Sequence, residues 1–212
     1  MNRIQTIVEK EWAEVFKNRI VLFTVAFLPI LFTALPLIIL YTTRGAASAG
    51  DSADLPPSFA KACGSITPGE CMQIFLVNQF MILFMMMPLI IPIAIASYSI
   101  VGEKATRSLE PLLATPITTP ELLAGKSLAA AVPAILATWL GFVVFVIAVP
   151  FVGGGPAIIT SILSSVWLTA IFVVGPLMAV MAVNFAIMVS SRVNDPRAAE
   201  QISAVVVVPI LG

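Results

Sequence analysis

Four long stretches of this sequence contain no Asp, Glu, Lys or Arg. They lie between Arg19 and Arg44, between Glu70 and Glu103, between Lys126 and Arg192, and from Glu200 to the last residue, Gly212. A transmembrane helix needs roughly 20 mostly apolar residues, because hydrocarbon about 30 Å thick is crossed at about 1.5 Å per residue. The runs do not alternate as the strands of a membrane barrel would. The sequence therefore predicts an all-α, polytopic transmembrane helix bundle.

The third stretch is long enough for two crossings, because Gly153-Gly154-Gly155-Pro156 is typical of a turn that ends one helix and starts the next. The fifth apolar run would rise only about 16 Å as a helix, so we expect the chain as given to stop inside a membrane helix. We expect a single transmembrane domain, 1–212, with an interfacial helix 1–19, crossings 20–43, 72–101, 127–152 and 157–189, an extracytoplasmic loop 44–71, cytoplasmic loops 102–126 and 190–201, and the start of a fifth crossing 202–212.

The placement of Lys and Arg predicts the orientation. With the N-terminus in the cytoplasm, nine of the 11 Lys and Arg residues lie on the cytoplasmic side, and only Arg44 and Lys61 lie outside. This orientation puts Cys63 and Cys71 in the outer loop, where an oxidising compartment favours a disulfide between them. Two free thiols are the alternative.

Residues 3–18 have the pattern of an amphipathic helix with Trp12 on its apolar face, which is typical of a helix lying in the membrane interface. Glu11 falls inside the apolar arc. Its carboxylate would reach headgroups or water, or it would meet a cation of the neighbouring cytoplasmic loop, with Lys104 and Arg107 as the candidates.

Several classes of chemistry are disfavoured. The chain has no histidine, which removes His-based metal sites, Ser-His triads and His proton relays. Gly125-Lys126-Ser127 resembles the end of a nucleotide-binding P-loop, but Pro120 stands where that motif needs its first Gly. We interpret Lys126 as a marker of the cytoplasmic end of the third crossing. A net charge of zero gives no support for a nucleic-acid partner.

The segment from Gly102 to Pro116 combines spaced charges with an apolar stripe. Glu103 and Arg107 are four residues apart, and Arg107 and Glu110 are three apart, so a short helix would carry a paired charged face. Thr119-Pro120-Glu121 then predicts a helix start, with Thr119 as the cap. The segment is either an amphipathic linker on the membrane or an element that docks into a groove of a soluble partner.

The same segment resembles the first cytoplasmic loop of permeases in type-2 ABC transporters. The resemblance rests on Glu103-Lys104, Leu109-Glu110, Leu112-Leu113, Thr115-Pro116 and Gly125-Lys126, followed by a membrane helix. Lys10-Glu11-Trp12 ahead of the first crossing is similar to the N-terminal elbow helix of that family. Asn194-Asp195-Pro196-Arg197 before an apolar run resembles the bacterial multidrug-type or sodium-efflux-type branch.

The resemblance implies a permease with six crossings that pairs with a separate ATPase subunit and with a second permease subunit, identical or different, in the lipid bilayer. ATP and Mg would be bound by the ATPase, and no cofactor or metal by this chain. The first cytoplasmic loop would couple the two proteins, through Glu103, Lys104, Arg107, Leu109, Glu110, Leu112 and Leu113.

Uncharged polar residues within the crossings have two interpretations. Asn78, Gln79, Ser97, Ser99 and Asn184 would either line a transport pathway or form hydrogen bonds between helices, at about 0.6 kcal/mol each. A gradient-driven secondary transporter or channel is the main alternative function, although no charged residue lies within the four spans. An intramembrane enzyme would need nucleophile–base pairs or metal ligands at that depth. Together with these observations, the resemblance implies a non-enzymatic permease subunit of an ATP-driven exporter in a bacterial cell membrane.

Overall fold

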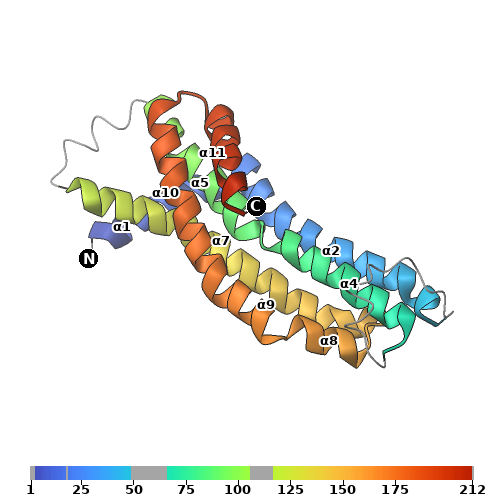
Figure 1. Cartoon of the computed structure of the whole chain (residues 1–212). Coiled ribbons are helices and arrows are strands. Elements are labelled where there is room, and N and C mark those ends of the chain that lie inside the picture. Colours follow the sequence, from blue (N-terminus) through green and yellow to red (C-terminus); the bar gives the residue numbers. More distant parts are fainter. Residues whose placement is uncertain (1–2, 18, 49–65, 106–116, 212) are drawn as a thin grey trace. The chain divides into compact units, whose positions relative to one another are not determined.

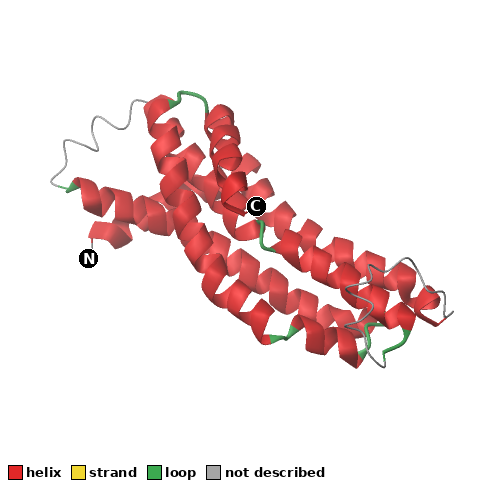
Figure 2. Cartoon of the chain, viewed as in Figure 1, coloured by secondary structure: helices red, strands yellow, loops and turns green. Residues whose placement is uncertain are grey.

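The structure is a computed structural model that describes residues 3–17, 19–48, 66–105 and 117–211. Over these residues it consists of helices joined by short loops (Figure 2). Four helical stretches among them are long and apolar enough to cross a membrane, Val21–Arg44, Pro68–Lys104, Thr119–Val152 and Pro156–Arg192. The prediction of a polytopic helix bundle is confirmed.

The elements are labelled along the chain in Figure 1. In order they are α1 (Arg3–Lys17), α2 (Arg19–Ser48), α4 (Pro68–Phe84), α5 (Met87–Ala105), α7 (Thr119–Ala148), a 3-10 turn (Val149–Val152), α8 (Pro156–Ile162), α9 (Ser165–Thr169), a π-helical segment (Ala170–Val174), α10 (Gly175–Arg192) and α11 (Pro196–Leu211).

Several helices extend into segments that the sequence analysis treated as loops. α2 continues through Ser48, α4 already begins at Pro68, and α5 and α7 extend into both ends of the predicted loop 102–126. α4 begins early because the Thr67 hydroxyl oxygen accepts from the Glu70 backbone N–H at 3.4 Å and donates to the Glu70 carboxylate at 3.0 Å. At α7 the corresponding contacts come from Thr118, one residue before the predicted cap, because its N–H and hydroxyl both donate to Glu121.

The second and fourth predicted crossings are interrupted. A turn at Met85–Met86 separates α4 from α5, and a break at Leu163–Ser164 followed by the π-helical segment divides the fourth crossing. π-helical turns leave backbone groups without their usual partners. Trp139 on α7 compensates one of them, because its indole N–H donates to the Ile171 carbonyl at 3.2 Å.

The chain forms two compact units, and each crossing contributes to both. Unit 1 consists of residues 1–28, 86–137 and 174–212, and unit 2 of residues 29–85 and 138–173. In unit 1, α5 packs against α10, α11 and α1. Small side chains permit this packing, since Ala179, Ala182 and Ala186 of α10 are fully buried. α5 is therefore the central helix of unit 1.

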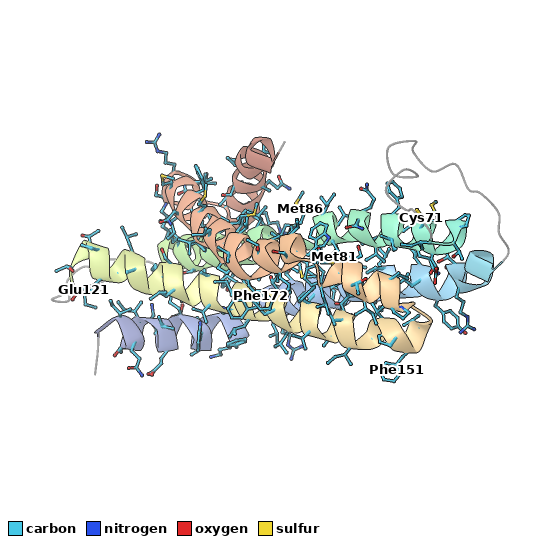
Figure 3. All side chains as sticks on the ribbon, turned by 60° about the horizontal axis from the view of Figure 1, so that its bottom comes forward. Cys71, Met81, Met86, Glu121, Phe151 and Phe172 are labelled. Atoms are coloured by element: carbon cyan, nitrogen blue, oxygen red, sulfur yellow. The ribbon has the colours of Figure 1, made fainter. Side chains whose placement is uncertain are left out.

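Unit 2 has an aromatic core. Phe142 of α7 makes edge-on contacts with Phe84 of α4 and with Phe172 of the π-helical segment, and Trp139 also contacts Phe172. Other large apolar side chains point outward, and Phe151 after α7 is 85% exposed (Figure 3). An apolar exterior on helices of this length is what lipid tails accept without cost.

Candidate functional site

Three helices of unit 1 bring charged side chains into a common interior. α1 supplies Lys10 and Glu11, α5 supplies Ser99 and Glu103, and α7 supplies Lys126. These five residues are called the ion cluster below. Glu11, Glu103 and Lys126 are only 2%, 3% and 6% exposed, so the cluster is enclosed by protein.

Lys126 is the centre of the cluster. Its ammonium lies 2.7 Å from one oxygen of Glu11 and 2.8 Å from one oxygen of Glu103, and it donates to the Ser99 hydroxyl oxygen at 2.9 Å. Ser99 in turn donates to the second oxygen of Glu11 at 2.5 Å. One lysine of α7 therefore links the carboxylates of α1 and α5.

Lys10 closes the cluster from the more exposed side. Its ammonium donates to Glu103 at 2.8 Å and lies 3.5 Å from Glu14 and 3.9 Å from Glu11. Burial lowers the pKa of Lys10, but the hydrogen bond and the charge of Glu103, with the charges of Glu14 and Glu11, outweigh it, so that the pKa lies above its ordinary value. The ammonium therefore stays charged at neutral pH.

The packing of α1 on α7 places these charges. The Trp12 indole N–H donates to the Ala129 carbonyl at 3.1 Å. Beside it, a Cβ atom on Gly125 would lie 2.7 Å from Ile7 Cγ2, so only glycine permits α1 to approach this closely. The predicted helix at the N-terminus is confirmed, and its location at a membrane surface stays a prediction.

The ion cluster corrects three sequence interpretations. The cation that pairs with Glu11 is Lys126, instead of Lys104 or a lipid headgroup. Arg107, the other predicted partner, lies outside the described residues. Lys126, interpreted only as a marker of the cytoplasmic end of the third crossing, is buried and paired with two carboxylates. Glu103 was assigned to contact an ATPase, yet its carboxylate is buried against Lys10 and Lys126.

Lys104 has a different partner set. Its ammonium donates to the carbonyl oxygens of Ser190, Ser191 and Val193, at 2.8, 2.6 and 3.2 Å. These carbonyls belong to the last turn and end of α10, where backbone acceptors lack intrahelical donors and the helix dipole favours a cation. Lys104 therefore fixes the end of α5 to the end of α10. The other residues predicted to couple to an ATPase, Arg107, Leu109, Glu110, Leu112 and Leu113, lie outside the described residues.

The polar residues predicted within the crossings separate into two groups. Asn78 is a hydrogen-bond hub of unit 2, because its amide oxygen accepts from the Trp167 indole at 2.8 Å and its NH₂ donates to the Ser161 hydroxyl at 3.2 Å. Gln79 and Asn184 are exposed, and the Asn184 amide donates to the Val180 carbonyl of its own helix. Asn78 thus has the geometry of an interhelical hydrogen-bonding residue, and a pathway role for Gln79 and Asn184 stays a prediction.

Replacing Asn78 with leucine is expected to lower the free energy of unfolding by about 1 kcal/mol, because two side-chain hydrogen bonds of about 0.6 kcal/mol are lost. Reversible unfolding of the purified protein in mixed micelles would measure this. Asn184→Leu is the matched control and should leave the unfolding midpoint unchanged, since its side chain bonds only to its own helix. Equal effects of the two substitutions would contradict this interpretation of Asn78.

The remaining candidate features concern cysteine and metal. Cys71 is buried in the first turn of α4, and Figure 3 shows it near the start of that helix. Cys63 lies outside the described residues, so the disulfide between them stays a prediction. Within the described ranges no group of three or more Cys, Asp and Glu side chains is arranged to hold a metal ion.

The ion cluster was not recognised from the sequence as one group, although Lys10, Glu11 and Glu103 were each singled out for another role. Ser99 was considered only as a polar residue within a crossing, and Lys126 only as a marker of topology and as part of the Gly125-Lys126 motif. The one local signal was Glu11 on an apolar helix face, which indicates a buried partner without identifying it.

The sequence matches a model of a known protein family. Residues 5–211 match the model described as ABC-2 family transporter protein, which covers nearly the whole chain. No curated protein matches the sequence.

Proposed function

The chain belongs to the ABC-2 transporter family, and from this premise we propose that it is the membrane-spanning permease subunit of an ATP-driven exporter in a bacterial cytoplasmic membrane, of the multidrug-type or sodium-efflux-type branch. A separate ATPase subunit would bind ATP and Mg and perform the hydrolysis. A second permease subunit, identical or different, would complete the transport pathway.

The observation that carries the proposal is the ion cluster. α5 ends at Ala105 and α7 begins at Thr119, so the cluster joins the helices on both sides of residues 106–116 to each other and to α1. Displacing one of these helices alone would separate buried opposite charges, which is costly in a low-dielectric interior. A force applied at residues 106–116 would therefore move α1, α5 and α7 together.

In this mechanism residues 106–116 are the contact with the ATPase. Arg107 and Glu110 would supply charged contacts, and Leu109, Leu112 and Leu113 would enter an apolar groove on the ATPase surface. ATP binding would favour one arrangement of the ATPase pair, and the permease would follow because its packed interfaces support discrete arrangements. Lys104 would extend the same movement to α10 through its three carbonyl contacts.

The sidedness of the proposal rests on the distribution of positive charge. With the N-terminus in the cytoplasm, nine of the 11 Lys and Arg residues are cytoplasmic, including those of the ion cluster and of residues 106–116. In this orientation residues 106–116, called the contact loop below, face the cytoplasm, where a soluble ATPase can bind them.

Affinity purification in mild detergent tests the proposal. The full chain, expressed in its native host, should bring down a soluble ATPase that carries a nucleotide-binding P-loop. Glu110→Lys should lower the amount recovered by about tenfold, because it reverses a charge at the predicted contact. Asp54→Lys is the control, since it makes the same reversal in the loop predicted to face outside.

Two results would contradict the proposal. If the wild-type chain purifies without any ATPase from membranes in which it is active, a gradient-driven transporter becomes the better assignment. If Asp54→Lys loses the ATPase and Glu110→Lys keeps it, the contact loop and the orientation are both wrong.

A further inference from the structure

Unit 1 contains a cavity of about 300 Å³ that plays no part in the ion cluster. Its wall combines apolar and charged side chains from α2, α5 and the start of α11, and includes Val21, Ala94, Tyr98, Asp195, Arg197 and Glu200. Sites for small organic ligands begin at about this volume and pair an apolar wall with a few polar groups.

Among the charged residues of this wall, Glu200 is the one whose carboxylate has oxygens available for a hydrogen bond or an ion pair with a ligand. Its side chain is half-buried, and it makes no ion pair or hydrogen bond with another residue in the part of the chain that the structure describes. Burial raises the pKa of the Glu200 carboxyl above its ordinary value. A cation that enters the cavity would stabilise the charged form of this carboxylate, which burial disfavours.

The other two charged residues of the wall are placed differently. One carboxylate oxygen of Asp195 accepts the backbone N–H of Arg197 at 2.8 Å, so Asp195 caps α11. Arg197 is exposed, so water screens its guanidinium. Asp195, Arg197 and Glu200 together carry a net charge of about −1, and the half-buried side chain among them, Glu200, is an acid.

Tyr98 supplies the second element of cation recognition. Tyr98 lines the same cavity as Glu200, and the face of an aromatic ring attracts an ammonium group through its quadrupole. Val21 and Ala94 are buried apolar residues on the same wall and would contact the apolar part of a ligand.

We propose that this cavity binds a small organic cation with an apolar body, with its ammonium group at Glu200 and the Tyr98 ring and its apolar part against Val21 and Ala94. The proposal concerns binding by this chain and does not depend on ATP-driven export.

Equilibrium binding to the purified full-length chain in nanodiscs tests the proposal with three probes of similar shape: 3-phenylpropylamine, 3-phenyl-1-propanol and 3-phenylpropionate. The amine should bind most tightly and the carboxylate most weakly. Glu200→Gln should weaken binding of the amine by about tenfold and binding of the alcohol by less than about twofold, because only the amine loses an ionic contact. Glu9→Gln removes an exposed carboxylate of α1 and should change neither affinity.

A second pair of variants keeps the proposal testable if Glu200→Gln folds poorly. Tyr98→Leu should weaken binding of the amine more than binding of the alcohol, whereas Tyr98→Phe should keep both affinities. Equal affinities for amine and alcohol, tightest binding of the carboxylate, or an unchanged affinity of Glu200→Gln for the amine would each overturn the proposal. None of these results bears on whether an ATPase co-purifies.

Discussion

Replacing Lys126 with methionine is expected to lower the free energy of unfolding by about 3–5 kcal/mol, because removing one partner of a buried ion pair leaves an uncompensated charge. Lys126 is 6% exposed, and its loss would leave the carboxylates of Glu11 and Glu103 in the interior with one fewer cation. Methionine has a similar length and an apolar side chain, so the effect reports the charge and not a cavity.

Reversible unfolding of the purified chain in mixed micelles measures this difference. Lys17→Met is the matched control, since Lys17 is an exposed lysine in the last turn of α1 and its replacement should leave the midpoint nearly unchanged. Equal stability of Lys126→Met and the wild type would show that the ion cluster does not hold the three helices.

Replacing Gly125 with alanine is expected to destabilise the chain by about 1–3 kcal/mol, because the added methyl group overpacks the contact between α1 and α7. The new Cβ would lie 2.7 Å from Ile7 Cγ2 and 3.0 Å from Ile7 Cβ, and the branching at Cβ leaves this side chain little freedom to rotate away. α1 would have to move away from α7, which also lengthens the contacts of Glu11 with Lys126.

Gly102→Ala is the matched control for this substitution. Gly102 is also a helical glycine of unit 1. Apart from its chain neighbours and the backbone of its own helix, no atom lies within 4 Å of an added Cβ. Alanine should therefore be neutral or stabilise α5 by up to about 1 kcal/mol. In a background that carries Ile7→Ala, the cost of Gly125→Ala should largely disappear. A full cost in that background would mean that the contact with Ile7 is not the cause.

The helices could be predicted from the sequence because lipid imposes a simple rule. A charge-free run of about 20 residues has few alternatives to a helix in hydrocarbon. Helix ends were predicted less well, although one signal was present: Thr67 and Glu70 have the spacing of a capping box around Pro68, and they start α4 earlier than the apolar run does.

The interruptions of the helices had weaker local signals. Pro88 follows the turn at Met85–Met86, and Gly175-Pro176 follows the π-helical segment Ala170–Val174, so prolines lie near both interruptions without indicating which form each one takes. The π-helical segment also receives a contact from elsewhere in the chain, because the Trp139 indole donates to the Ile171 carbonyl. A single sequence does not display contacts of that kind.

The candidate site was predicted only in part for the same reason. Glu103 and Lys104 were singled out as contacts of an ATPase, but the partners that the structure gives them are set by tertiary packing. Lys126 is 115 residues from Glu11, and Ser190 is 86 residues from Lys104. Periodicity on one helix identifies a residue that needs a partner, but it does not identify a partner on another helix.

A double-mutant cycle between Glu11 and Lys126 tests the central claim most directly, namely that the ion cluster fastens α1 to the helices beside residues 106–116. The free energies of unfolding of Glu11→Gln, Lys126→Met and the double variant would be compared with that of the wild type. We expect the double variant to be more stable than the sum of the single effects predicts, with a coupling energy of about 1–3 kcal/mol. Additive effects, with a coupling energy near zero, would contradict the account.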